Sequence, residues 1–228
     1  MKKTIVLSLG GSLIVPEKID FSFLDKFKHT LREHYRIYKF VVVCGGGVVA
    51  RKYIEALKKE GKSKYELSEA GIRATRMNAM FMMQFFGKEA NDKLPLNIKA
   101  VHSNIHKNNV VFCGALRFNK DATSDTTAGN LAHALKTAFI NMTNVKGLYT
   151  SDPRKDPKAR FIPKISWKEF EKMALKTKYA PGQHFVLDQS AAILIRKHKI
   201  PTYIIGKNLK SLENIFKNKK FEGTLIEG

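Results

Sequence analysis

The chain has 228 residues, 43% of them hydrophobic, which is enough to bury the core of one large domain or of two closely joined halves. Lysine and arginine outnumber aspartate and glutamate by 41 to 20, a net charge of +21. These basic residues are spread along the chain without an arginine-rich arm or an aromatic-basic motif, so we do not expect nucleic acid as the ligand. A positive field also favours small phosphorylated molecules.

The sequence gives no reason to expect export or membrane insertion. The apolar run near the N-terminus is short, contains glycines and lacks a small-residue cleavage site. No stretch approaches the roughly 18 apolar residues that a membrane span needs. Cys44 and Cys113 each end an apolar strand-like run, a position that suits a small buried hydrophobe better than a disulfide or a metal site. We therefore expect a cytoplasmic protein without membrane contact.

Strand-like and helix-like segments alternate along the whole chain. We expect strands at residues 4–9, 39–44, 109–113, 138–143 and 201–205. We expect helices near residues 21–34, 47–60, 66–90, 125–137, 166–177, 187–198 and 208–217. Several of the strands are apolar on both faces, as buried parallel strands are. This alternation predicts an α/β fold whose ligands bind at the carboxyl ends of the strands.

The first two strands both end at glycine turns. The stretch LSLGGSLIV at residues 7–15 ends its strand at two glycines and Ser12, and the second strand runs into Gly45, Gly46 and Gly47 before a helix-like segment. Glycines leave no Cβ in the turn, so an anion can approach the backbone N–H groups and the positive end of the helix dipole. One such turn alone could be a tight connection that binds nothing. Two of them predict two anionic groups, or one nucleotide held from both sides.

The helix-like segment near residues 66–90 is apolar over most of its second half. We expect its methionines and phenylalanines in the core or at a subunit interface, which is a modest argument for an oligomer. Polar residues near its start are candidates to reach a ligand: Ser68, Glu69, Arg73 and Arg76.

Hydroxyl and carboxylate groups gather in the loop after the third strand. Thr123, Ser124 and Asp125 suit a helix N-cap, but one cap needs only one residue. The surplus indicates a site for a second phosphate. Later in the chain, the Asp152-Pro153 pair reads as a turn, and Asp188, at the start of an apolar helix, is as well explained by an N-cap as by a catalytic role.

Taken together, six stretches resemble the amino acid kinase family, and within it the UMP kinases of the archaeal type. They are LGGSLIVPEKID, VVVCGGGVVARKYI, GIRATRMNAM, TNVKGLYTSDPRKDPKA, the helix that opens at Asp188, and the closing GTLIE. The resemblance covers essentially the whole chain. It implies a single domain over residues 1–228 with the carbamate kinase-like fold, an open three-layer α/β sandwich with a mainly parallel central sheet. Residues 1–135 would bind the acceptor and residues 136–228 would bind ATP, in a homohexamer built as a trimer of dimers.

The same resemblance implies transfer of the γ-phosphoryl group of ATP to UMP, with Mg²⁺ accompanying ATP, in pyrimidine nucleotide biosynthesis. The positions that match ATP contacts are Gly11, Ser12, Gly47, Arg51, Thr143, Asn144, Tyr149 and Asp152. Those assigned to UMP are Gly46, Ser68, Ala122, Thr123 and Ser124, and those assigned to catalysis are Arg51, Asp188 and Lys146. A phosphate acceptor needs no general base, and we expect no dedicated protein metal site, because Mg²⁺ would sit mainly on phosphate oxygens.

Three positions depart from the family pattern. Ser8 stands where many members have a lysine, although the archaeal type also lacks that lysine. Ser68 stands where an aspartate usually binds the UMP ribose or base, and Glu69 is a candidate substitute. Lys146 replaces an aspartate, and it either supplies the cation missing at Ser8 or is a solvated surface lysine.

Three alternatives to a UMP kinase stay open at this stage. They are a family member acting on a different phosphorylated acceptor, a catalytically silent nucleotide-binding regulator, and a nucleic-acid-binding protein whose association would be salt-sensitive.

Overall fold

The computed structural model describes residues 2–116, 123–153, 156–176 and 186–228. Its centre is a seven-stranded sheet in the order β3-β2-β1-β4-β8-β9-β7. These strands are β1 (Lys3–Leu9), β2 (Tyr38–Cys44), β3 (Val110–Cys113), β4 (Phe139–Met142), β7 (Lys164–Ile165), β8 (Thr202–Ile205) and β9 (Thr224–Ile226). The five strands from β3 to β8 are parallel, and β9 is antiparallel to β8. A separate hairpin-like pair joins β5 (Leu148–Tyr149) to β6 (Phe161–Ile162).

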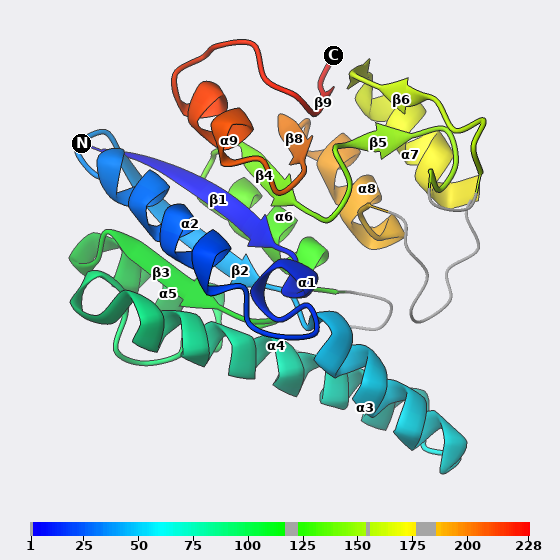
Figure 1. Cartoon of the computed structure of the whole chain (residues 1–228), viewed down its shortest axis with the longest axis horizontal. Coiled ribbons are helices and arrows are strands. Elements are labelled where there is room, and N and C mark those ends of the chain that lie inside the picture. Colours follow the sequence, from blue (N-terminus) through cyan, green and yellow to red (C-terminus); the bar gives the residue numbers. More distant parts are fainter. Residues whose placement is uncertain (1, 117–122, 154–155, 177–185) are drawn as a thin grey trace.

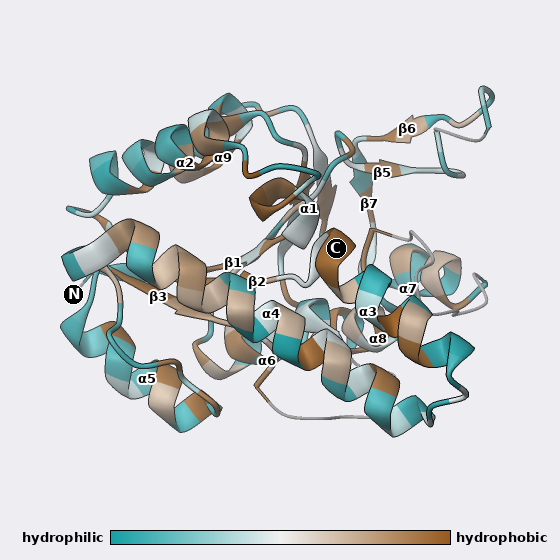
Figure 2. Ribbon diagram, turned by 60° about the horizontal axis from the view of Figure 1, so that its bottom comes forward, coloured by the Kyte–Doolittle hydropathy of each residue, from teal (hydrophilic) through white to brown (hydrophobic). Residues whose placement is uncertain are grey.

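Helices cover both faces of the sheet and give three layers (Figures 1 and 2). One face packs against α2 (Phe21–Glu33), α4 (Lys64–Phe86) and α9 (Leu209–Phe216). The other packs against α5 (Ile98–Lys107), α6 (Ser124–Ala134), α7 (Trp167–Lys176) and α8 (Gln189–Lys197). The short α1 (Gly11–Ile14) and α3 (Gly47–Lys59) begin at the carboxyl ends of β1 and β2, and η1 (Gly87–Glu89) follows α4. The predicted three-layer α/β fold is confirmed.

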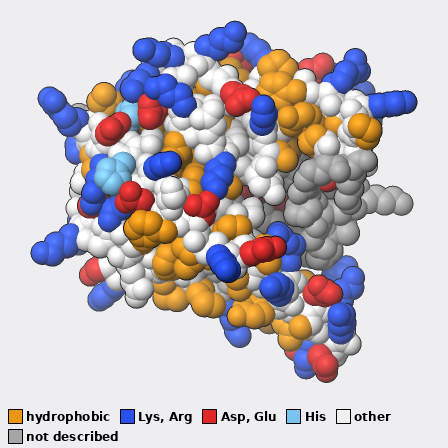
Figure 3. All heavy atoms as spheres, in the orientation of Figure 1, with side chains coloured by type: hydrophobic (Ala, Val, Ile, Leu, Met, Phe, Trp, Pro, Cys, Tyr) orange, Lys and Arg blue, Asp and Glu red, His pale blue; other side chains and the backbone are white. Residues whose placement is uncertain are grey.

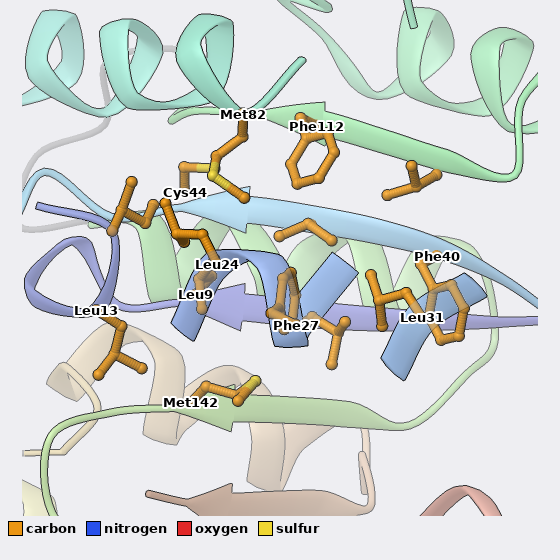
Figure 4. Packing of buried hydrophobic residues seen from close by; sticks show 14 of the residues in the cluster. Leu9, Leu13, Leu24, Phe27, Leu31, Phe40, Cys44, Met82, Phe112 and Met142 are labelled. Carbon is orange, nitrogen blue, oxygen red and sulfur yellow. The ribbon is translucent and has the colours of Figure 1, made fainter. Parts of the chain in front are cut away.

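The sheet is buried on both faces, as its apolar strands predict. Along β1, Leu7 and Leu9 belong to the cluster under α2, while Val6 belongs to the cluster on the opposite face. Figure 4 shows Leu9 between β1 and α2, with Phe27 of α2 and Met142 of β4 among the labelled neighbours. Burying each such side chain contributes about 1.5–3 kcal/mol. This packing fixes the strand ends from which the site residues project.

The cysteine prediction is confirmed, because Cys44 and Cys113 are both buried and free. Burial raises the pKa of the Cys113 thiol to about 12, so it stays protonated. None of the helices in the described part of the chain is long and apolar enough to cross a membrane.

The sequence prediction missed α5 and the short strands. In α5 the buried residues are Val101 and Ile105, a stripe too narrow to stand out from its polar neighbours. A start signal was present, since the Asn97 side chain accepts a hydrogen bond from Ala100 N at 2.8 Å. The strands β5, β6, β7 and β9 have two or three residues each, which is too short for an alternating pattern to register.

Candidate phosphoryl-transfer site

The two glycine turns lie in direct backbone contact at the carboxyl ends of β1 and β2. A Cβ added at Gly11 would lie 2.3 Å from Gly47 N and 2.5 Å from Gly45 O. A Cβ added at Gly47 would lie 2.4 Å from the Gly11 carbonyl carbon, and Gly47 also has a left-handed φ of +58°. Only glycine therefore satisfies both space and conformation at this junction.

The helices that begin at these turns lack a side-chain cap. The N-cap residues of α1 and α3 are Gly10 and Gly46, and neither makes a side-chain hydrogen bond. Seven other described helices are capped by a side chain that accepts from a backbone N–H, namely Asp20, Ser63, Asn97, Thr123, Ser166, Asp188 and Asn208. The first N–H groups of α1 and α3 thus stay available to an anion where the two turns meet.

One side chain supports this junction, and a second lies on the helix that starts from it. The Asn78 side chain of α4 is buried and donates from Nδ2 to Gly45 O at 2.7 Å, which fixes the second turn. Arg51, in the second turn of α3, is partly buried and forms no ion pair with the described part of the chain. The structure thus brings the predicted residues Gly11, Ser12, Gly46, Gly47 and Arg51 to one edge of the sheet.

A second group of residues joins the starts of α6 and α8. The Asp188 carboxylate accepts hydrogen bonds from the Thr123 hydroxyl at 2.5 Å, the Thr126 hydroxyl at 2.8 and 3.1 Å, and Ala191 N at 2.7 Å. Both residues are also N-caps, Thr123 for α6 and Asp188 for α8. The cap interpretation of Asp188 is therefore correct, and the same carboxylate also orients Thr123 of the expected acceptor loop.

Asp125 belongs to this group, and the sequence prediction did not single it out as a site residue. It lies in the first turn of α6, is partly buried and accepts a hydrogen bond from the Ser8 hydroxyl at 2.8 Å. Burial and the nearby negative charge of Asp188 raise the pKa of Asp125 to about 7, and the Ser8 hydrogen bond opposes this rise. The only signal in the sequence was the surplus of capping residues at 123–125.

The raised pKa of Asp125 predicts a pH-dependent stability. Between an ordinary pKa of 3.8 and the folded value of about 7, the folded chain holds a proton that the unfolded chain has released. This contribution to stability is therefore complete below pH 3.8 and is lost as the pH rises through about 7. An Asp125→Asn variant keeps the acceptor for Ser8 and cannot ionise, so its melting temperature should exceed that of the wild type at pH 8 and approach it at pH 5. Parallel melting curves for the two proteins across this range would contradict the assignment.

The remaining ATP candidates follow β4. Thr143 N donates to Ile205 O at 2.9 Å, which fixes the start of this segment beside β8, and Asn144 comes next. Tyr149 lies in β5 with its ring edge-on to Phe161 at 5.4 Å between centroids, and Asp152 lies in the loop beyond. These residues leave the same edge of the sheet as the glycine turns.

Lys146 lies in the loop between β4 and β5. Its ammonium group is 2.9 Å from Glu222 Oε1, and the two side chains are 68% and 46% exposed. The hydrogen bond and charge of Glu222 raise the pKa of Lys146. The lysine is thus cationic and paired in this conformation.

Of the UMP candidates, Ser124 begins α6 beside Thr123, and Ala122 lies outside the described residues. Ser68 lies on α4, one turn before Gly71. The Gly71 carbonyl oxygen would be 3.5 Å from a Cβ at Gly46, so this part of α4 packs beside the second glycine turn. The structure therefore places Ser68 on the helix that borders the turn.

The arrangement can hold two anions side by side. Uncapped amides and Arg51 lie at the starts of α1 and α3, and hydroxyl groups lie at the start of α6. Within the described ranges, no group of three or more His, Cys, Asp or Glu side chains could hold a metal ion.

Comparisons with known proteins agree with this geometry. The family model described as the amino acid kinase family matches residues 3–206. Uridylate kinase from Pyrococcus abyssi is 33% identical over 225 residues, which cover 98% of this chain and 99% of that protein. Uridylate kinase from Archaeoglobus fulgidus is 34% identical over 225 residues, covering 97% and 99%.

Solved structures give the same result. The crystal structure of uridylate kinase from Archaeoglobus fulgidus aligns with a TM-score of 0.84 at 32% identity, covering 99% of this chain and 100% of that one. UMP kinase from Ureaplasma parvum aligns with a TM-score of 0.80 at 19% identity and full coverage of both chains, which supports the fold alone.

Proposed function

The chain belongs to the amino acid kinase family, and from this premise we propose that it is a UMP kinase, which transfers the γ-phosphoryl group of ATP to UMP and releases UDP and ADP. The observation that carries the proposal is the contact between two glycine turns whose helices start without side-chain caps. The uridylate kinases that match over nearly their whole length support UMP as the acceptor. The reaction would serve pyrimidine nucleotide biosynthesis.

The chemistry requires alignment of two anions that repel each other. The phosphate of UMP is already a nucleophile, so no residue has to remove a proton from it. Backbone amides of α1 and α3 with Arg51 would hold the phosphates of ATP, while Thr123 and Ser124 would hold the acceptor. Fixed donors of this kind stabilise the charge that spreads over the transferred group.

Mg²⁺ would accompany ATP in this reaction and would neutralise part of the charge on the phosphate oxygens. The described residues offer no dedicated metal cluster, which fits an ion held through phosphates bound at the glycine turns. Gly11 and Gly47, through their backbone, would therefore place the ion by placing the phosphates.

We also propose a homohexamer in the cytoplasm. Met77 and Met80 of α4 are 48% and 45% exposed, and Figure 3 shows hydrophobic side chains gathered over the region of α4. A face this apolar supports burial against other subunits. Two free buried cysteines suit a reducing compartment. Light scattering should give a mass near six times the 25.8 kDa of one chain.

The function is tested by a coupled assay of ADP release with Mg-ATP and a panel of UMP, CMP, dUMP, GMP and isopentenyl phosphate. Turnover with UMP far above the other acceptors is expected. Preference for another acceptor would agree with the family assignment but would contradict UMP as the substrate. If no acceptor is phosphorylated, a catalytically silent nucleotide-binding protein would be favoured. A nucleic-acid-binding protein would be favoured instead if the chain binds nucleic acid in a salt-sensitive way and free nucleotides do not compete.

The role proposed for Lys146 makes a separate prediction. If Lys146 supplies the cation that is missing at Ser8, it must leave Glu222, and Lys146→Ala should lower kcat by about tenfold or more. Glu222→Gln is the matched control, because it breaks the ion pair but keeps the ammonium group. Steady-state kinetics in which Lys146→Ala retains the wild-type kcat would show that Lys146 is only a surface lysine.

A further inference from the structure

Two neighbouring side chains of α4 form hydrogen bonds with the backbone that follows β3. Arg76 donates from Nε to Ala115 O at 3.2 Å and from Nη2 to Leu116 O at 2.9 Å. The Thr75 hydroxyl accepts from Ala115 N at 2.9 Å and donates to Ile72 O at 2.7 Å. The peptide groups of two consecutive residues are thus fixed by three hydrogen bonds from one turn of α4.

Close packing reinforces these hydrogen bonds. A Cβ at Gly114 would lie 2.6 Å from the Thr75 hydroxyl oxygen and 2.7 Å from Arg76 N, so the strand end lies directly against α4. Thr75 is buried, and Arg76 is partly buried along the contact. These contacts lie beyond β3, whose residues Val110–Cys113 are themselves fully buried.

The place of these hydrogen bonds in the chain suggests a function for them. Residues 114–116 lead from β3 towards Thr123 and Ser124, the expected acceptor-binding residues. Thr123 is bonded to Asp188, which caps α8, and Leu116 is bonded to Arg76 of α4. The same helix also fixes the second glycine turn through Asn78. The same helix therefore bonds both the second glycine turn and the backbone that follows β3.

We infer that Arg76, supported by Thr75, is a positioning residue for the phosphate acceptor, acting through the backbone of Ala115 and Leu116. The inference rests on the proposed UMP kinase function and adds a residue to it. The guanidinium group is suited to this role because its planar fork reaches two consecutive carbonyl oxygens at once. A lysine ammonium is a point charge and cannot reproduce that fork.

The test compares Arg76→Ala and Arg76→Lys with the wild type by steady-state kinetics. Arg76→Ala should raise the KM for UMP by about tenfold or more, because hydrogen bonds from a charged donor would be lost. The KM for ATP should change little, and Arg76→Lys should recover part of the loss. Arg36→Ala is the control, since Arg36 is an exposed arginine before β2, at the opposite end of the sheet.

A variant pair at Thr75 separates positioning from folding. Thr75→Ser keeps the hydroxyl that accepts from Ala115 N, whereas Thr75→Val keeps the shape and loses it. Thr75→Val should raise the KM for UMP, and Thr75→Ser should not. If the wild type phosphorylates UMP but KM for UMP is unchanged in Arg76→Ala, or if the KM for ATP rises equally, the inference is overturned. A wild type without UMP turnover would instead overturn the proposed function.

Discussion

A Gly11→Ala variant is expected to lose ATP binding and a large part of its stability, although only one methyl group is added. The new Cβ would lie 2.3 Å from Gly47 N and 2.5 Å from Gly45 O, and both contacts are backbone atoms that cannot rotate away. Overpacking of a filled site costs about 1–3 kcal/mol. The two turns would have to separate, and the amides of α1 and α3 would no longer converge on one ligand.

Gly47→Ala should have a similar effect with an added cost. Its φ of +58° is unfavourable for any residue with a Cβ, by about 1–2 kcal/mol. Gly61→Ala is the matched control, because Gly61 has a φ of +70° and nothing within 4 Å of the added Cβ. The difference between these two variants therefore isolates the contact between the turns from the cost of the backbone conformation.

Urea unfolding and calorimetric titration with ATP measure the two consequences. We expect Gly11→Ala and Gly47→Ala to have a lower free energy of unfolding than Gly61→Ala. We also expect their Kd for ATP to be about tenfold or more above that of Gly61→Ala. Equal stability and equal ATP affinity in all three variants would show that the turns separate freely. In that case the touching turns could not be the element that organises the site.

The overall fold could be predicted from the sequence because its strands are long apolar runs. VVVC in β2 and VVFC in β3 are buried on both faces, and this composition is typical of the middle of a parallel sheet. The order of the edge strands could not be predicted in this way. The short segment β9 becomes a strand because β8 offers it a free edge, and β7 becomes one because β9 does, which is a tertiary effect.

The candidate site could be predicted where its residues directly follow the end of a strand in the sequence. The glycine turns at Gly11 and Gly47 were visible as sequence patterns, but their mutual contact was not, because it joins residues far apart in the chain. Asp125 was missed as a hydrogen-bonded carboxylate of the site for the same reason, since its partner Ser8 is 117 positions away. Arg76 was expected only as a candidate to reach a ligand, because its carbonyl partners depend on how α4 packs against β3.

Asp188→Asn is expected to lower kcat by about a hundredfold while leaving the fold intact. The carboxylate accepts from the hydroxyls of Thr123 and Thr126 and from Ala191 N, so both oxygens are engaged. An asparagine caps a helix about as well as an aspartate, so the cap to Ala191 N should survive. Its NH₂ group is a donor, however, and one of the two hydroxyls must turn away from it. We therefore expect the substitution to change the orientation of Thr123 and to weaken charge stabilisation in the transition state. The loss of one correctly placed donor lowers the rate by about a hundredfold.

The cap at Asp20 provides the control for this prediction. Asp20 caps α2 by accepting from Phe23 N at 3.0 Å, so Asp20→Asn changes the same functional group at the start of another helix and also removes a partly exposed ion pair with Lys207. Melting temperatures of the two variants should be lowered to a similar small degree, and only Asp188→Asn should lose turnover. Thr126→Val, which removes the other hydroxyl that bonds Asp188, should reproduce part of the loss of kcat, whereas full activity in Asp188→Asn would mean that the carboxylate serves as a cap alone.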